Sequence, residues 1–416
     1  MKNIKYNILA LLSILLGIAF VVVFSKRFGA SKSSDIYFIS MLIVTYMGYF
    51  VQAIWEAFSP YYAECKKNGS QDYKILYSIL LNNTMAMSFL IIVIYFLITH
   101  FFNILDSEYK KFLDIFIFSL LFQNILFYNK GVLNLEQFYS IFYVVDIIIN
   151  GILLVGIVVF DDLIMVAYLT LISMIAASIF QFIFILRAKI NYSAVFYKPS
   201  LNLCEIYKNS IKLKLSSIIY GYKDIAIANI FTDTAGLYSL YSYANKIMGV
   251  LLQIINAPAL NIFGTKATFW VMSKSFNEIN IAVKDLLRHT IVLYILSSLI
   301  AYFLIPFAIN IIVKDAFRSE QISTIQNIFI LLSLSGILIL IMSPYGRIIT
   351  ALKRFNAIIV FSIIFALIVF LSEVLVGRNY IYFMFGYIFA YLVFMLLHLI
   401  FWHKVYKVNS WAKSSF

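Results

Sequence analysis

Long apolar stretches separated by short polar breaks run through the whole chain. Each stretch is about 20 residues long or longer, which is enough for a helix to cross a hydrocarbon core of about 30 Å. The pattern predicts twelve spans, at residues 6–25, 35–58, 75–102, 112–128, 138–160, 163–186, 213–231, 235–262, 289–313, 324–346, 355–376 and 381–402. Because the stretches are continuous and do not alternate in short segments, they favour helices over a β-barrel.

The composition supports a membrane protein. Hydrophobic residues make up 63% of the 416 residues and charged residues only 12%, whereas soluble domains carry roughly 25% charged residues. The first stretch is followed by Lys26-Arg27 and not by a small-residue cleavage site, so we interpret it as a span and not as a signal peptide. The predicted fold class is an all-α polytopic membrane protein with about 12 transmembrane helices.

Basic residues predict the orientation. If the N-terminus lies inside, the cytoplasmic segments hold 22 of the 32 Lys and Arg residues and the outer loops hold 8. The positive-inside rule therefore places both termini in the cytoplasm. The net charge of +13 is scattered over membrane-flanking loops, which argues against nucleic-acid binding.

The longest polar break divides the chain into six spans and six spans. We expect an N-terminal bundle at 1–190, a cytoplasmic linker at 191–212 and a C-terminal bundle at 213–416. The second and eighth spans echo each other, since each opens with a turn residue two positions before a tyrosine and reaches a proline, at Pro60 and Pro258. Such a repeat predicts a pseudo-twofold axis along the membrane normal and a substrate site near the midplane between the halves.

Three segments resemble a known family. "FGASKSSDIYF" followed by "EAFSPYYAECKK" resembles the region around the second helix of MviN-type lipid II flippases, and "GLYSLYSYANKIMGVLLQIINAP" resembles their eighth helix. These flippases belong to the multidrug/oligosaccharidyl-lipid/polysaccharide exporter superfamily. The resemblance implies two pseudo-symmetric six-helix bundles around a central cavity that opens alternately to either side of the membrane.

Two departures change the substrate that the resemblance implies. MviN-type flippases usually have fourteen spans, whereas twelve are expected of Wzx-type flippases for O-antigen and capsule repeat units. The family's arginine in the second helix is also absent, and Tyr46 and Tyr49 occupy that region. We therefore expect a flippase that carries an undecaprenyl-pyrophosphate-linked oligosaccharide, an O-antigen (lipopolysaccharide) or capsule repeat unit, across the bacterial cytoplasmic (inner) membrane. The alternatives are a lipid II flippase, a drug/cation antiporter of the same superfamily, and a membrane polysaccharide polymerase or glycosyltransferase.

Charged residues inside the spans are the candidate site. Lys223 and Asp224 lie about ten residues into the seventh span, Lys246 lies about eleven into the eighth, and Asp146 has a similar depth in the fifth. At about 1.5 Å per residue these positions are roughly 15 Å deep. An uncompensated charge there costs at least about 2.5–3.5 kcal/mol. Either Asp146 or Asp224 pairs with Lys246, or the cations line a cavity that receives pyrophosphate and sugars.

The turn after the first span adds two candidates. Lys26 lies nine residues before Asp35, which matches the spacing of the resembling family's arginine, although a lysine at a helix end can also snorkel to the interface. Arg27 and Lys32 are expected to belong to a hydrated turn. The expected substrate-binding residues are thus Lys246, Lys223 and Lys26, and the candidates for coupling to Na⁺ or H⁺, or for ion pairing, are Asp224, Asp146 and Asp35.

Neighbouring residues on a helix point about 100° apart. We therefore expect Lys223 and Asp224 to face different directions, so that one forms an ion pair while the other meets the ligand.

Enzymatic functions have little support in the sequence. The four histidines show no metal-ligand spacing, no nucleophile motif occurs, and Cys65 and Cys204 are expected to be free thiols. Asp161-Asp162 resembles the acidic pairs of membrane glycosyltransferases, but no large outer loop surrounds it. We expect no catalysis, cofactor or metal. The expected partners are the lipid-linked oligosaccharide pyrophosphate, membrane lipids and the polysaccharide polymerase machinery.

Overall fold

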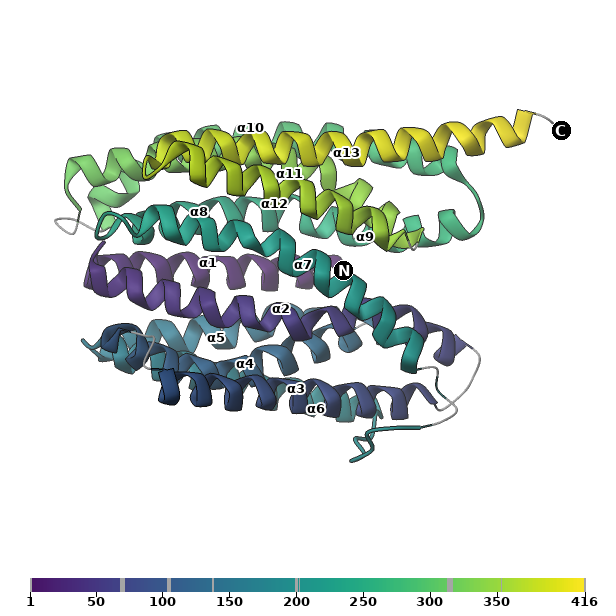
Figure 1. The fold of residues 1–416 in the computed structure, drawn as a ribbon, viewed down its shortest axis with the longest axis horizontal. Helices are drawn as coiled ribbons and strands as arrows, with labels where there is room; N and C mark the ends of the chain where they lie inside the picture. The colour runs from purple at the N-terminus through teal and green to yellow at the C-terminus, as the bar shows by residue number, and fades with distance from the viewer. Residues whose placement is uncertain are drawn as a thin grey trace. The chain divides into compact units, whose positions relative to one another are not determined.

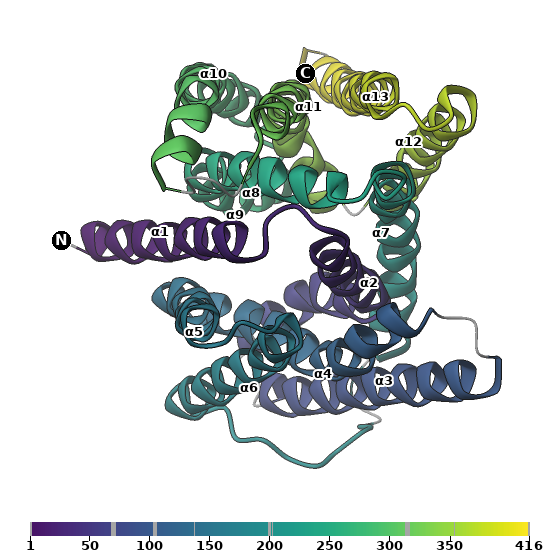
Figure 2. The same cartoon turned by 90° about the vertical axis from the view of Figure 1, so that its left-hand side faces the viewer.

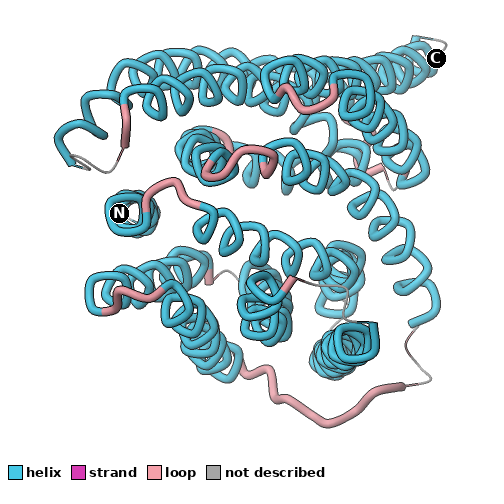
Figure 3. Tube along the Cα trace, turned by 60° about the vertical axis from the view of Figure 1, so that its left-hand side comes forward, coloured by secondary structure: helices cyan, strands magenta, loops and turns pink. Residues whose placement is uncertain are grey.

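The computed structural model describes residues 2–67, 72–102, 106–136, 138–198, 201, 203–312, 317–352 and 354–414. These residues form α-helices joined by loops and turns, with no strand among them (Figure 3). The helices are α1 (Lys2–Phe28), α2 (Lys32–Lys67), α3 (Asp72–Phe102), α4 (Ser107–Leu135), α5 (Tyr139–Val159), α6 (Leu163–Arg187), α7 (Leu203–Phe231), α8 (Leu237–Ile255), α9 (Ala257–Met272), α10 (Phe276–Ile312), α11 (Ser319–Ala351), α12 (Phe355–Val376) and α13 (Tyr380–Ser414).

The helices follow the predicted spans. Eight of the described helices are long and apolar enough to cross a membrane by length and composition. The prediction of an all-α polytopic membrane protein is confirmed. One predicted span is not continuous, because α8 ends at Ile255 and α9 begins at Ala257, within the stretch predicted as 235–262. Pro258 explains the new start, since proline is tolerated in the first turn of a helix but removes a hydrogen bond from its interior.

The helices form two compact units, Met1–Ile218 and Ile219–Phe416, and the boundary lies within α7 (Figure 1). The predicted domain limits at 190 and 213 stay predictions. In the first unit, α2 packs on α4, α3 on α4, α4 on α6, and α5 on α6 (Figure 2). In the second unit the helices at the equivalent places pack in the same pairs, namely α8 on α11, α10 on α11, α11 on α13, and α12 on α13. This repetition supports the internal repeat inferred from the echo between the halves.

Buried tyrosines join the helices of the first unit. The rings of Tyr77 on α3 and Tyr128 on α4 stack with 5.6 Å between their centroids. Their hydroxyls are satisfied, since Tyr77 donates to Asn129 Oδ1 at 2.9 Å and Tyr128 donates to the carbonyl of Tyr77 at 3.2 Å. Buried hydroxyls need such partners because an unpaired polar group in an apolar interior is costly. The pairs therefore specify how α3 and α4 pack.

A glycine permits the close approach of two helices in the second unit. A Cβ at Gly336 on α11 would overlap the hydroxyl of Tyr294 on α10. Tyr294 is fully buried, so its ring has little room to move away. The contact between α10 and α11 thus depends on the missing side chain.

Candidate functional site

Lys223 and Asp224 form an ion pair on α7. Lys223 Nζ lies 2.5 Å from Asp224 Oδ1, and it also lies 5.1 Å from the centroid of the Tyr220 ring. The expectation that the two side chains face different directions is wrong. The four-carbon stem of a lysine is long enough to bring its ammonium back to a neighbouring carboxylate, and the pairing offsets the cost of removing both charges from water.

A chain of hydrogen-bonded tyrosines lies beside this pair, of which Tyr387 and Tyr391 are buried and Tyr220 is half-buried. The hydroxyls of Tyr220 on α7 and Tyr391 on α13 are 2.7 Å apart, and Tyr387 donates to Tyr391 at 3.3 Å. Such hydrogen-bonded networks polarise one another and specify a single arrangement of the helices that carry them. The sequence did not predict a role for these tyrosines, although two tyrosines, Tyr220 and Tyr222, come just before the charged pair.

A second carboxylate joins α7 to α12. Glu373 accepts hydrogen bonds from the Tyr222 hydroxyl, at 2.5 Å, and from Asn229 Nδ2, at 3.0 Å. Both of its oxygens are therefore hydrogen-bonded to neutral donors. The sequence did not predict these contacts, because Glu373 lies near the end of a predicted span.

Lys246 is exposed on one side of α8. The buried residues of this helix are Tyr238, Ser239, Leu240, Tyr241, Tyr243, Ala244, Met248 and Val250. Lys246, Gly249 and Gln253 are exposed and recur at positions i, i+3 and i+7, so they share one helix face. We call these three residues the α8 polar stripe. Gln253 was not among the candidates from the sequence, since a single glutamine within an apolar run carries little signal.

In the first unit, Lys26 is exposed and Asp35 is buried (4% exposed) in the first turn of α2. The loop between α1 and α2 turns at Gly29, which has a positive φ of 60°. A glycine adopts that conformation without strain. Lys32 forms an exposed ion pair with Glu108 at 3.0 Å, as expected of a residue in a hydrated turn.

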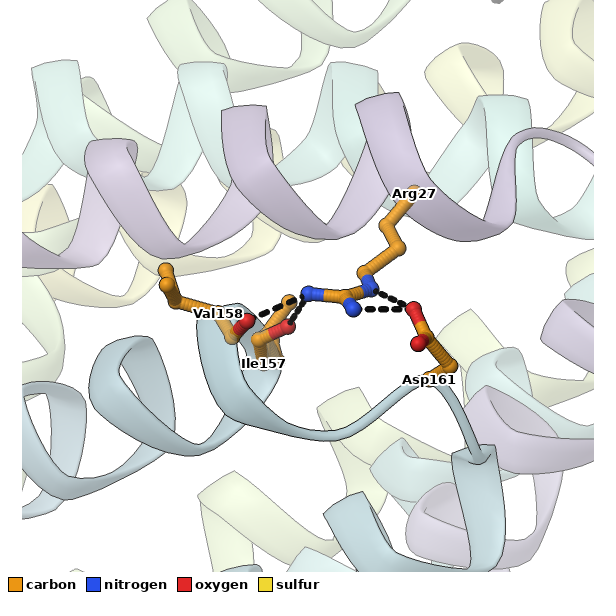
Figure 4. A network of polar contacts seen from close by, with 4 residues as sticks. All are labelled: Arg27, Ile157, Val158 and Asp161. Carbon is orange, nitrogen blue, oxygen red and sulfur yellow. Dashed lines mark hydrogen bonds and ion pairs between the residues drawn. The ribbon is translucent and has the colours of Figure 1, made fainter.

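Arg27 has a different place from the one expected. Its guanidinium donates to the carbonyls of Ile157 and Val158, at the end of α5, and to Asp161 Oδ1 (Figure 4). The last carbonyls of a helix have no partners within the helix, and a cation near them is favourable. Arg27 therefore ties the end of α1 to the end of α5 and does not simply lie in a hydrated turn.

The two acidic residues of the short loop after α5 have structural contacts. Asp161 receives the Arg27 guanidinium. Asp162 caps α6, since its side chain accepts a hydrogen bond from the backbone N–H of Ile164 at 3.0 Å. These contacts account for both carboxylates.

Asp146 on α5 has a cation on the neighbouring helix. Lys130 Nζ on α4 lies 3.8 Å from Asp146 Oδ1. Lys130 was assigned to a loop from the sequence, because the apolar stretch was judged to end at residue 128, whereas α4 continues to Leu135. The pairings predicted for Lys246 stay predictions.

Solved structures of transporters share this arrangement of helices. The lipid II flippase MurJ in an inward closed conformation matches with a TM-score of 0.76 and 19% identity, over 95% of this chain and 87% of that one. An inward-facing multidrug resistance MATE family transporter of the MOP superfamily matches with a TM-score of 0.73 and 11% identity, over 96% of this chain and 95% of the other.

A third match is a MOP superfamily transporter from Pyrococcus furiosus, described as having a binding pocket of reverse polarity. Its TM-score is 0.69 at 13% identity, and the match covers 98% of this chain and 96% of that one. A scan against family models found no match, and a search of curated proteins found none. The chain therefore has the fold of the MOP superfamily transporters, as the resemblance of its sequence motifs implied.

Proposed function

We propose that the chain is a flippase for a lipid-linked oligosaccharide in the bacterial cytoplasmic membrane. Its cargo is an undecaprenyl-pyrophosphate-linked repeat unit of O-antigen or capsule, which it moves from the cytoplasmic to the outer leaflet by alternating access. The proposal includes the two six-helix bundles predicted at 1–190 and 213–416 and the cytoplasmic location of both termini. The likeness to a lipid II flippase supports the transport of a lipid-linked sugar pyrophosphate.

The α8 polar stripe is the observation that carries this proposal. Lys246 is exposed about halfway along a membrane helix whose other face is buried. A lysine that faced lipid at this depth would be costly, so such residues face protein or a water-filled cavity. In this proposal the α8 polar stripe therefore faces a water-filled cavity. The Lys246 ammonium can bind pyrophosphate, and the Gln253 amide can bind sugar hydroxyls. Gly249 lets the substrate approach the backbone closely.

The charged pairs rank the candidate cations. Asp224 offsets the charge of Lys223, and Asp146 offsets that of Lys130. Lys246 and Lys26 are both exposed, and in this proposal they contact the pyrophosphate. At an effective dielectric of about 20, a unit charge 4 Å from another gains about 4 kcal/mol before desolvation is counted. Asp224, Asp146 and Asp35 remain the candidates for coupling to Na⁺ or H⁺.

A drug/cation antiporter is the closest competitor in this fold. Cationic substrates need an acidic or neutral cavity, whereas the α8 polar stripe carries an ammonium. A glycosyltransferase or polymerase would need free carboxylates in an outer pocket, and Asp161 and Asp162 are engaged by Arg27 and by the start of α6. Neither alternative accounts for the α8 polar stripe. We therefore propose that the protein is a transporter that works together with the polysaccharide polymerase machinery.

Transport of defined lipids tests the proposal. Proteoliposomes that contain the full chain would receive, in separate samples, a fluorescent undecaprenyl-pyrophosphate oligosaccharide, fluorescent lipid II and a cationic dye. We expect protein-dependent movement of the oligosaccharide lipid between leaflets, measured by quenching of the accessible fluorophore. Movement of lipid II alone would favour the lipid II flippase, and export of the dye alone would favour the antiporter; either result would overturn the repeat-unit assignment.

A further inference from the structure

The segment between α6 and α7 forms an extended strap along α3. The strap is residues 190–198, which have no regular secondary structure (Figure 2). The backbone N–H of Ser193 donates to Ser78 Oγ at 3.1 Å, and Asn82 Nδ2 donates to the carbonyls of Ser193 at 3.1 Å and Val195 at 2.8 Å. The strap is thus fastened to one face of α3 through its backbone.

Two further contacts fix the ends of the strap. Tyr192 donates its hydroxyl to Asn82 Oδ1 at 2.6 Å, and Lys198 Nζ lies 2.5 Å from Asp72 Oδ1. The chain therefore runs from the level of Asn82 back to the first residue of α3. Ser78 and Asn82 lie six and ten residues into the helix, which is about 9 and 15 Å along its axis.

The strap lies next to the exposed apolar surfaces of α3 and α6. The exposed large apolar side chains of α3 begin at Phe89 and continue to Phe101, so the lipid-facing part of this helix starts just beyond the strap. On α6, Ile179, Ile183 and Leu186 are exposed, and they extend the lipid-facing surface to the last turn before the strap. The strap covers Ser78 and Asn82 at the point where α3 passes into the interface.

Apart from Asn191, the exposed side chains of the strap are aromatic or apolar. Tyr192, Val195, Phe196 and Tyr197 are exposed, with 57% of Phe196 and 67% of Tyr197 accessible, whereas Ile190 is buried. Large apolar side chains on a hydrated loop would be unfavourable. Tyrosine and other amphipathic rings are favoured at the level of the lipid headgroups.

The segment around the strap is basic, although Lys198 is paired with Asp72 of α3. Arg187, Lys189 and Lys198 are basic, and no acidic residue lies between Asp162 and Glu205. The Arg187 guanidinium lies 4.8 Å from the centre of the Phe184 ring, an arrangement in which a cation is held against an apolar surface. Basic residues near a membrane attract acidic lipids with about 1 kcal/mol each.

We propose that the strap binds the headgroups of acidic phospholipids and inserts Phe196 and Tyr197 into the interfacial layer of the membrane. Its continuity with the lipid-facing surfaces of α3 and α6, together with its basic charge, favours a lipid surface over a soluble protein partner. The segment between the sixth and seventh helices is then a membrane anchor and not a hydrated loop. This inference depends only on the membrane location of the helices and not on the transported substrate.

Fluorescence quenching in vesicles tests the anchor. The full chain would carry Cys65→Ser and Cys204→Ser, with an environment-sensitive label on Phe196→Cys in one sample, on Ile183→Cys as a lipid-facing reference and on Ser273→Cys as a hydrated reference. With lipids that carry a quencher near the headgroup, we expect the label at 196 to be quenched several-fold more than the label at 273. Adding phosphatidylglycerol to phosphatidylcholine vesicles should increase this quenching.

The second part of the experiment tests whether membrane binding depends on the basic residues. Arg187→Gln and Lys189→Gln should each reduce the preference for phosphatidylglycerol vesicles by about fivefold. Phe196→Trp gives a readout without cysteine chemistry and guards against a misfolded labelled variant. Because the chain has four native tryptophans, the quenching by brominated lipids is taken as the difference between this variant and the unsubstituted chain. A label at 196 that behaves like the label at 273 in both kinds of vesicle would overturn the proposal. Protection of that label by a soluble cell fraction, without quenching by lipid, would overturn it in favour of a protein partner.

Discussion

Lys223 and Asp224 are consecutive on α7, yet their charged ends meet, with 2.5 Å between Lys223 Nζ and Asp224 Oδ1. The two opposite charges offset each other within one helix. Replacing either residue alone therefore removes this ion pair from the other one.

The first prediction tests this dependence. Asp224→Asn leaves the Lys223 ammonium without its carboxylate among buried tyrosines. Breaking a buried pair costs about 3–5 kcal/mol, and we expect the lower end because the side chains are 15% and 17% exposed. The double variant Lys223→Met with Asp224→Asn should recover most of the thermal stability in detergent. Equal stability of the single variant and the wild type would show that the pair contributes nothing.

The second prediction concerns Lys246. Lys246→Ala should abolish surface polysaccharide while the protein remains in the membrane, because the variant lacks the ammonium that we propose binds the pyrophosphate. Lys246→Arg should retain much of it, since a guanidinium also binds phosphate. Surface polysaccharide and membrane protein level are measured together. Lys266→Ala, another exposed lysine of the same unit, is the control and should have little effect.

A structural role for Lys246 makes a different prediction. If the residue only balanced an acidic partner, its replacement would lower the amount of protein, and neutralising the partner as well would restore function. A normally abundant and fully active Lys246→Ala would remove the residue from the proposed site.

The third prediction concerns the contact of Arg27 with the end of α5. Arg27→Ala should destabilise the first unit by about 2 kcal/mol, because charge-assisted hydrogen bonds to the Ile157 and Val158 carbonyls are lost. Asp161→Asn should cost only about 0.5 kcal/mol, because this carboxylate is 87% exposed and exposed ion pairs contribute little. Thermal unfolding in detergent measures both. Equal losses would contradict the assignment to the helix end.

The fourth prediction concerns the contact between α10 and α11. Gly336→Ala should destabilise the protein by about 1–3 kcal/mol, since the new Cβ overlaps the Tyr294 hydroxyl. Adding Tyr294→Phe should recover only part of the loss, because the Cβ would still lie 2.7 Å from the ring carbon Cζ. Full recovery in unfolding measurements would mean that the hydroxyl alone sets the distance between the helices.

Hydropathy made the spans predictable, because continuous apolar runs of membrane length rarely occur outside transmembrane helices. The break after Ile255 was not predictable in the same way, since α8 and α9 share one apolar run and only Pro258 marks the new start. The direction of Lys223 depends on a rotamer choice that helix geometry does not determine. Lys130 lies just beyond the stretch predicted as 112–128, and Gln253 is a single polar residue inside the stretch predicted as 235–262, so hydropathy singled out neither.

The strap shows a different limit. The strap is short and contains both polar and apolar residues, so its sequence predicted a cytoplasmic linker. The contacts of Ser193 and Val195 with Ser78 and Asn82 join residues more than a hundred positions apart. No local pattern can predict such contacts, because the polar residues of α3 are ordinary for a helix end when α3 is considered alone.

The pairing of Lys130 with Asp146 has a consequence for biosynthesis. Lys130 leaves the ribosome before Asp146, so its charge is present in α4 before the carboxylate of α5 exists. Entry of α4 and α5 into the bilayer as one hairpin would compensate both charges at the moment of insertion. The charged pair of α7 lies within a single helix, and that helix can leave the translocon without waiting for a neighbour.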